Sequence, residues 1–403
     1  MKAASILVMA GFAIFGFSFV MGNTNSDNVI VDINGTSSSN NVSTNFSDST
    51  KYLFAQANSF LSKRPTSVMD KTQLPASGDR HDFLSLSPYC WPDPKSPKGS
   101  PLICQDKMGV NPEFYTIPDF KNMQDMIKRV KTLALAYHFS QNESYASKAA
   151  DLLRVWFLNN DTKMNPNMQY AQVILGINNG THAGIIGGKD FPEIIDTLDM
   201  ISNSRSWTSQ DQKGVKLWFT HYLDWLMNSA AGIQEGKSTN NHGTWYNVQV
   251  SAIALFLDKS EITEKFLQKT KLELIPSQIL PDGRQPLELK RPFSLYYSVF
   301  NLLGLFKLAN IGEHVGIDLW DYKTNRGAGL QKAFDYLLPY LSNESSWPYV
   351  QNKPIDMYKA ANLLGEAAEH YPDSEIYMQA YRSFDRKYVN ADIDNLASLA
   401  PRK

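Results

Sequence analysis

Apolar residues recur at steps of three and four from about residue 119 onward, which is the spacing of amphipathic helices. The first two such segments, 123–137 and 146–157, are separated by a short Asn-Glu-Ser break, so we expect a helical hairpin. Alternating strand patterns are scarce. The pattern predicts an all-α protein whose paired helices form a solenoid or a closed ring of hairpins around a central cleft. The further predicted helices cover residues 215–226, 244–257, 262–275, 294–310, 328–342 and 354–370.

The N-terminus has a different pattern. An apolar run, Ile6–Met21, follows Met1-Lys2, is short for a bilayer span and leads into a segment rich in Asn, Ser and Thr. We expect residues 1–22 to be a signal peptide rather than a membrane anchor, and residues 23–51 to be a disordered, N-glycosylated stalk. The globular domain would then span residues 52–403 of a secreted, extracellular protein that leaves the membrane once the signal is cleaved.

Two further features fit an oxidising, extracellular compartment. Cys90 and Cys104 are the only cysteines and share a Pro- and Gly-rich segment, so we expect them to form one disulfide. Their segment, residues 84–118, is long and aromatic, as is typical of a lid or a binding wall, and also of a flap that only packs against the domain. Seven Asn-X-Ser/Thr sequons are candidate glycosylation sites: Asn34, Asn41, Asn45, Asn142, Asn160, Asn179 and Asn343.

Composition narrows the range of partners. The 39 basic and 40 acidic residues nearly cancel, so the chain has no global field that would attract nucleic acid. The seven histidines include no close pair of the kind that binds zinc, and we expect neither a metal nor another cofactor. We also expect a monomer.

The stretch "NNHGTWYNVQ", residues 240–249, combines amides, an imidazole, an indole and a phenol. Thr239 or Asn240 is a suitable N-cap, which places Asn241 and His242 in the first turn of a helix, where free N–H groups favour anions. Helical spacing puts His242 and Tyr246 on one polar face, together with Gln249. We expect this face to line a wet cleft.

A second cluster follows about fifty residues later in "PDGRQPLELKRPFSLYYSVFNL", residues 281–302. A Pro-Asp-Gly turn leads to Arg291, and a helix that starts near Ser294 carries Tyr296 and Tyr297. Removing the proton beside a sugar carboxylate builds a dianionic enolate, so neutralising the carboxylate is the main electrostatic task.

The two clusters together supply the groups for this chemistry. Arg291 and Asn241 could hydrogen-bond the carboxylate oxygens. His242 could take the proton or assist the base as a hydrogen-bond partner, and a tyrosine could protonate the leaving oxygen or serve as both acid and base. These roles predict β-elimination.

At these clusters the sequence resembles the alginate lyase family, polysaccharide lyases that act on uronic-acid polymers by β-elimination. The segments "SGDRHDFLSLSPYCWPDP" (77–94), "GVNPE" (109–113) and "QVILGINNGTHAGIIGG" (172–188) extend the resemblance. It implies an (α/α) toroid, an incomplete barrel of helix hairpins with a central substrate cleft and an N-terminal lid loop.

The resemblance also implies site residues. Asn241, His242 and Arg291 match the family's catalytic positions, and Tyr297 is preferred as the catalytic tyrosine because the family's tyrosine follows a variable aromatic or His position, here Tyr296. The resemblance and the polar face of the helix indicate these substrate contacts: Arg80, His81, Tyr89, Trp91, His182, Tyr246 and Tyr296.

Departures from the family pattern leave the substrate open. Many members carry an Arg after the Gly of "GTHAGIIGG", where this chain has Thr181 followed by His182. An anionic polysaccharide is expected, either alginate with its polymannuronate blocks or glucuronan. Two alternatives remain: a glycoside hydrolase that uses Asp282 and Glu288 as its two carboxylates, and a secreted glycan-binding protein without turnover.

Overall fold

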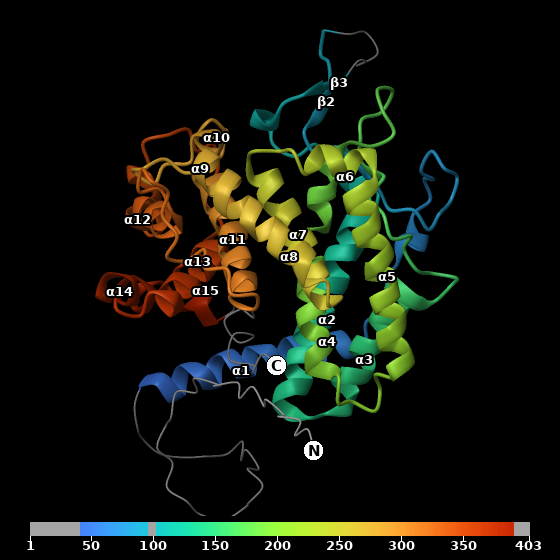
Figure 1. Ribbon diagram of the computed structural model, residues 1–403. Helices are drawn as coiled ribbons and strands as arrows, with labels where there is room; N and C mark the ends of the chain where they lie inside the picture. The colour runs from blue at the N-terminus through green and yellow to red at the C-terminus, as the bar shows by residue number, and fades with distance from the viewer. Residues whose placement is uncertain (1–40, 96–101, 391–403) are drawn as a thin grey trace, which may run out of the picture. The chain divides into compact units, whose positions relative to one another are not determined.

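The computed structural model describes residues 41–95 and 102–390, and the chain from Val42 onward forms one compact unit (Figure 1). The expected signal peptide, Asn34 and the first part of the expected stalk lie outside the described residues. None of the described helices is both long and apolar enough to cross a bilayer.

Paired helices build the first half of this unit. The expected hairpin is confirmed as α2 and α3, which pack side by side and are separated by Gln141 in the left-handed conformation and by Asn142, the N-cap of α3. A π-helical turn, Arg154–Leu158, extends α3. The helices of this half are α1 Asn41–Leu61, α2 Asp119–Ser140, α3 Glu143–Leu153, α4 Phe191–Ile201, α5 Ser209–Asn228, α6 Ala230–Glu235 and α7 Asn241–Phe256.

The second half continues the helical pattern. The helix expected over 262–275 is divided between α8 and a π-helical segment, Thr270–Leu274, and α11 starts at Ser294 as predicted. The helices are α8 Ser260–Lys269, α9 Ile275–Gln278, α10 Pro286–Leu289, α11 Ser294–Glu313, α12 Leu330–Leu341, α13 Met357–His370, α14 Glu375–Ser383 and α15 Arg386–Asn390. Helix α11 packs against α7, α12 and α13.

Within the described ranges, strands are short and form two two-stranded sheets. β1 (Leu84–Leu86) pairs in parallel with β4 (Tyr170–Val173), and β2 (Cys90–Pro92) pairs antiparallel with β3 (Leu102–Cys104). The β2–β3 ladder aligns Cys90 with Cys104, and these two residues form the expected disulfide. In Figure 1 this hairpin stands at the top of the view, at the end of the unit where α6 and α10 lie.

Helix α7 lies between two apolar clusters. Its residues Tyr246, Val250 and Ile253 belong to a cluster built mainly from α1 to α5, while Trp245 and Val248 belong to a second cluster built around α11 to α13. Packing on both sides explains why α7 is buried around most of its circumference, polar residues such as Asn247 and Gln249 included. The helix is therefore a rigid wall, and its N-terminal turn has a fixed position.

One expected boundary is wrong. The disordered stalk was expected to extend to residue 51, but α1 begins at Asn41. Ser49, Leu53, Ala57 and Phe60 follow at helical spacing and are buried. The stripe that faces the core therefore starts before residue 52, and helix propagation carries the order toward the N-terminus.

Candidate active site

The N-terminal turn of α7 holds Asn241 through a buried carboxylate. Asn240 is the N-cap, and its side-chain oxygen accepts a hydrogen bond from the backbone N–H of His242. The backbone N–H and the Nδ2 of Asn241 each donate to the carboxylate of Glu288, at 2.8 Å. Burial raises the pKa of Glu288. Asn241 is thus fixed in place, and its Oδ1 is buried without a hydrogen-bond partner among the described residues.

His242 and His182 share a second buried carboxylate. The Nδ1 of His242 lies 2.7 Å from Oε1 of Glu235, and the Nδ1 of His182 lies 2.8 Å from Oε2 of the same residue. Glu235 is the last residue of α6 and is 0% exposed, whereas 22% of the His242 side chain and 35% of the His182 side chain are exposed. The two histidines are therefore held together from separate segments, α7 and the 3₁₀ segment His182–Gly188.

Arg291 lies against Tyr297. Its guanidinium carbon is 3.7 Å from the centre of the Tyr297 ring, and its Nε donates to Asp106 Oδ2 at 2.7 Å. The Tyr297 hydroxyl lies 3.1 Å from that of Tyr89. Burial, reinforced by the neighbouring Tyr89, raises the pKa of Tyr297 more than Arg291 lowers it. The phenol is therefore protonated at neutral pH and can donate a proton.

A pocket of about 910 Å³ opens beside Arg291 and Tyr89, and its lining does not include Asn241, His242, His182 or Tyr297. Its charged lining consists of Arg291, Lys290, Lys107 and Asp106, and Tyr89 also lines it. Three cations against one carboxylate give the pocket a positive balance, which favours an anionic ligand.

The two neighbouring tyrosines have different surroundings. Tyr297 contacts Arg291, whereas the ring of Tyr296 lies under Lys353 and Lys359, whose Nζ atoms are 5.3 and 5.7 Å from its centre. Tyr296 also stacks on Phe300, with ring centres 6.0 Å apart. Tyr296 therefore adjoins a second group of cations rather than the Arg291 guanidinium.

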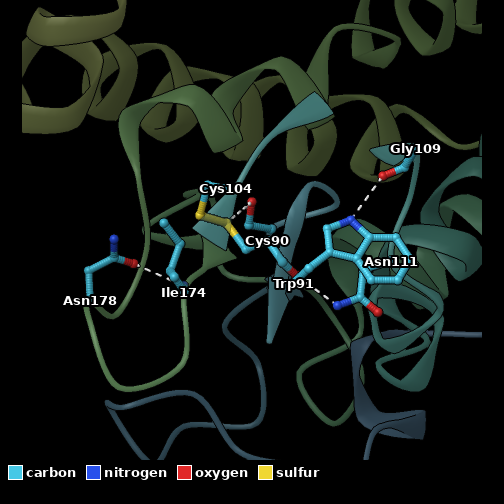
Figure 2. Close-up of a disulfide and its surroundings, with 8 residues drawn as sticks. Cys90, Trp91, Cys104, Gly109, Asn111, Ile174 and Asn178 are labelled. Atoms are coloured by element: carbon cyan, nitrogen blue, oxygen red, sulfur yellow. Dashed lines mark hydrogen bonds between the residues drawn. A yellow bond between two sulfur atoms is a disulfide. The ribbon is translucent and has the colours of Figure 1, made fainter. Parts of the chain in front are cut away.

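The disulfide-linked hairpin carries Tyr89 to the site, because Tyr89 immediately precedes Cys90. Figure 2 shows how the base of the hairpin is fastened: Trp91 donates to the carbonyl of Gly109 at 3.3 Å, and Asn111 donates to the carbonyl of Cys90 at 2.7 Å. Trp91 is half-buried in this frame and is not among the residues that line the 910 Å³ pocket.

The expected wall residues Arg80 and His81 do not line that pocket either. Arg80 is exposed, and its carbonyl accepts a hydrogen bond from the buried Lys71. The Nδ1 of His81 lies 2.7 Å from the carbonyl oxygen of Lys163. Both residues belong to a turn that is braced against the loop after α3.

The prediction that one polar face of α7 lines a wet cleft is wrong. Tyr246 is 3% exposed and donates its hydroxyl proton to the carbonyl of Leu226, and Gln249 is fully buried, with its amide donating to the carbonyl of Ile185. Tyr246 therefore cannot make the substrate contact that the sequence predicted. The reason is that α7 is packed on both sides by the two apolar clusters, whereas His242, in its N-terminal turn, keeps 22% of its side chain exposed.

The sequence did not predict the contacts that three acidic residues make with the site: Glu235, Glu288 and Asp106. Glu288 was considered only as a hydrolase carboxylate, and the other two lie outside the two clusters. The sequence signal for Glu235 was its place in the short segment "AAGIQEG", just before the stretch that contains His242.

In the described part of the chain, no group of three or more His, Cys, Asp or Glu residues is arranged to hold a metal ion.

Comparison with known proteins identifies the family. The alginate lyase family model matches residues 67–347. An alginate lyase from Bacteroides ovatus is 38% identical, with a TM-score of 0.84 over 89% of this chain and 95% of that chain. Alginate lyase A1-III from Sphingomonas species A1 is 15% identical, with a TM-score of 0.52 over 88% of this chain and 97% of that chain. No curated protein matches.

These similarities bear on the fold and on the class of enzyme. A variant of alginate lyase A1-III in complex with a tetrasaccharide also matches, at 15% identity and a TM-score of 0.53 over 88% of this chain and 96% of that chain. The shared architecture confirms the expected (α/α) toroid. Because the family model spans well over half of the sequence, the chain belongs to the alginate lyase family and is a polysaccharide lyase.

Proposed function

We propose that this protein is a secreted lyase that cleaves a polyuronate, either alginate or glucuronan, by β-elimination. The observation that carries the proposal is the Arg291 guanidinium stacked on Tyr297. The Asn241–His242 turn of α7 is linked to it through Glu288, which accepts two hydrogen bonds from Asn241 and whose pKa, raised by burial, is lowered in part by the nearby Arg291 and His242. Solved relatives are an alginate lyase from Bacteroides ovatus and an alginate lyase A1-III variant bound to a tetrasaccharide, which supports an anionic sugar polymer as the substrate.

The first task of the site is to neutralise the substrate carboxylate. Arg291 has donors left for this role because only its Nε is used by Asp106. The Nδ2 of Asn241, at the positive end of the α7 dipole, uses one of its two protons on Glu288 and keeps the other for a carboxylate oxygen. Fixed donors of this kind stabilise the enolate more than the neutral carbon acid, and thereby lower the barrier.

Two further groups move the protons. His242 takes the proton from the carbon beside the carboxylate through Nε2, since its Nδ1 is bound to Glu235. The electron pair of that C–H bond forms the new double bond, and the bond from the next carbon to the bridging oxygen breaks. Tyr297 donates its phenolic proton to that oxygen, and exchange with water restores both groups.

The pocket favours a substrate with several carboxylates. Lys107 from the lid and Lys290 from the end of α10 flank Arg291, and each could pair with a neighbouring uronate. A neutral glucan would leave these cations without partners. We infer that consecutive uronate residues occupy the cleft.

Secretion and glycosylation are part of the same proposal. The Cys90–Cys104 disulfide fits an oxidising compartment. Four of the sequons have exposed Asn side chains, which glycosylation requires: Asn142, Asn160, Asn179 and Asn343.

The hydrolase alternative has less support. Asp282 is exposed and pairs with Arg284 in the turn before α10, and the Glu288 carboxylate is bound by Asn241. Both carboxylates already have structural partners, and neither has the free position that an acid or a nucleophile needs.

The test is ultraviolet absorbance of the new conjugated double bond during incubation with polymannuronate, polyguluronate, glucuronan and a neutral glucan. We expect a rise on one polyuronate, and we expect Tyr297→Phe and His242→Ala each to lower kcat by about 10²-fold or more. New reducing ends without a rise in absorbance would show hydrolysis and overturn the elimination mechanism.

A further inference from the structure

Glu235 is the centre of a three-residue unit, His182–Glu235–His242. Each carboxylate oxygen of Glu235 contacts the Nδ1 of one histidine, at 2.7 and 2.8 Å, and Glu235 itself is fully buried. The Ser238 hydroxyl lies 3.5 Å from Oε2, and Tyr246 of α7 packs nearby with its hydroxyl bound to Leu226. Lys269 of α8 donates to the adjacent carbonyl of Gly236 rather than to Glu235.

The chemistry of this contact fixes the histidine tautomers. An ionised carboxylate only accepts hydrogen bonds, so both Nδ1 atoms must carry hydrogen. A neutral imidazole then has its lone pair on Nε2. Because the Nδ1 side of each ring faces a buried carboxylate, the exposed part of each ring is the part that carries Nε2.

We propose that Glu235 is a positioning residue for the lyase reaction, which holds His242 with its Nε2 lone pair toward the substrate, and that His182 completes this arrangement by occupying the other carboxylate oxygen. The inference rests on the proposed use of His242 as the base. A carboxylate that orients an imidazole in this way keeps it in the tautomer that can accept a proton. Glu235 does not itself contact the substrate.

His182 has a specific part in the unit. Without it, one oxygen of a buried carboxylate would lose its strongest donor, because the Ser238 hydroxyl lies at the limit of hydrogen-bond distance. The carboxylate could then rotate away from His242. His182 therefore acts on the base through Glu235, although its sequence position suggested only a substrate contact.

Glu235→Gln tests the proposal in the full-length protein. A glutamine offers one oxygen and one amide, so it can accept from only one of the two Nδ1 atoms, and the other histidine must change to the Nε2–H tautomer. We expect kcat on the cleaved polyuronate to fall about 10²-fold or more, with KM changed little because Arg291 and Asn241 are intact. Glu235→Asp keeps two acceptor oxygens and should retain more of kcat than Glu235→Gln does.

Ring ¹⁵N chemical shifts of histidine-labelled protein report the tautomers directly, with His182→Ala and His242→Ala used for assignment. We expect Nδ1–H for both rings in the unaltered protein and a changed tautomer for one of them in Glu235→Gln. The matched control is Glu313→Gln, because Glu313 also pairs with a histidine Nδ1, that of His370, at 3.3 Å. That variant should leave kcat and the His182 and His242 signals unchanged.

The outcomes separate this inference from the proposed function. Unchanged kcat in a folded Glu235→Gln variant whose His242 ring has changed to the Nε2–H tautomer would overturn the role of Glu235, as would an Nε2–H tautomer of His242 in the unaltered protein. If the unaltered protein cleaves no polyuronate, the proposed function fails, while the ¹⁵N signals still show whether Glu235 sets the tautomers.

Discussion

At the scale of single residues, this site depends on groups that are already bound to partners. Arg291 is held by Asp106 at Nε and by the ring of Tyr297, and Asn241 is held by Glu288. These contacts fix the orientation of each donor before substrate arrives. A preorganised site of this kind avoids reorganisation when charge develops in the transition state.

The Arg291→Lys substitution tests whether the site needs the planar guanidinium of Arg291 or only its positive charge. Lysine keeps the charge but loses the planar group that stacks on Tyr297 and the separate Nε donor for Asp106, so we expect kcat/KM to fall about 10²-fold. Steady-state kinetics on the cleaved polymer measure the effect. Arg284→Lys is the control, because Arg284 pairs with Asp282 at an exposed turn. Equal kcat/KM for both variants would show that only charge is needed at position 291.

At the scale of elements, the β2–β3 hairpin carries part of the site. The disulfide lies between Tyr89, which contacts Tyr297, and Asp106, which contacts Arg291. Since the described segment around it has few helical contacts of its own, the covalent link restricts where these two side chains can lie. The contacts of Tyr89 with Tyr297 and of Asp106 with Arg291 then join the hairpin to the segment around the start of α11.

The double substitution Cys90→Ser and Cys104→Ser should separate the effect of the disulfide on the placement of Tyr89 and Asp106 from its effect on global stability. We expect kcat/KM to fall about tenfold because Tyr89 and Asp106 are less well placed, while the melting temperature changes by only a few degrees because the two apolar clusters are intact. Kinetics and thermal unfolding of the same preparation measure both. A large loss of melting temperature with unchanged kcat/KM would contradict a role confined to the lid.

At the scale of the whole molecule, α7 couples the two apolar clusters, and a polar link joins α3 to α5 within the first cluster. Arg154, at the end of α3, donates twice to the Asp211 carboxylate in the first turn of α5, at 2.9 and 2.8 Å. These bonds, followed by those from Thr208, lower the pKa of Asp211 to about 2. The carboxylate therefore stabilises the fold at every pH at which it is ionised.

The sign of this effect gives a prediction for acid stability. The pKa of Asp211 is lower in the folded than in the unfolded chain, so its contribution is present above about pH 4 and is lost as the pH falls toward 2. Asp211→Asn should lower the free energy of unfolding by about 1–2 kcal/mol at pH 7 and by progressively less below pH 4. Denaturant unfolding across this range measures it. A difference that stays constant down to pH 2 would refute the assignment to ionised Asp211.

The sequence by itself determined the helical fold, the family, the disulfide, and the start of α7 and α11, because each depends on local spacing or on motifs read along the chain. Helical periodicity placed α2, α3 and α11, and an N-cap at Thr239 or Asn240, which the structure shows to be Asn240, placed Asn241 and His242 in a first turn. These features follow from contacts between residues near in sequence.

Only the tertiary structure decided which polar residues reach the cleft and what holds them. Tyr246 was expected in the cleft and is buried, because packing by two separate clusters closes that face of α7. Glu235 and Asp106 join the site through contacts with His182 and Arg291, residues 53 and 185 positions away in the sequence. Such pairings depend on how helices and lid meet in space, and no local pattern encodes them.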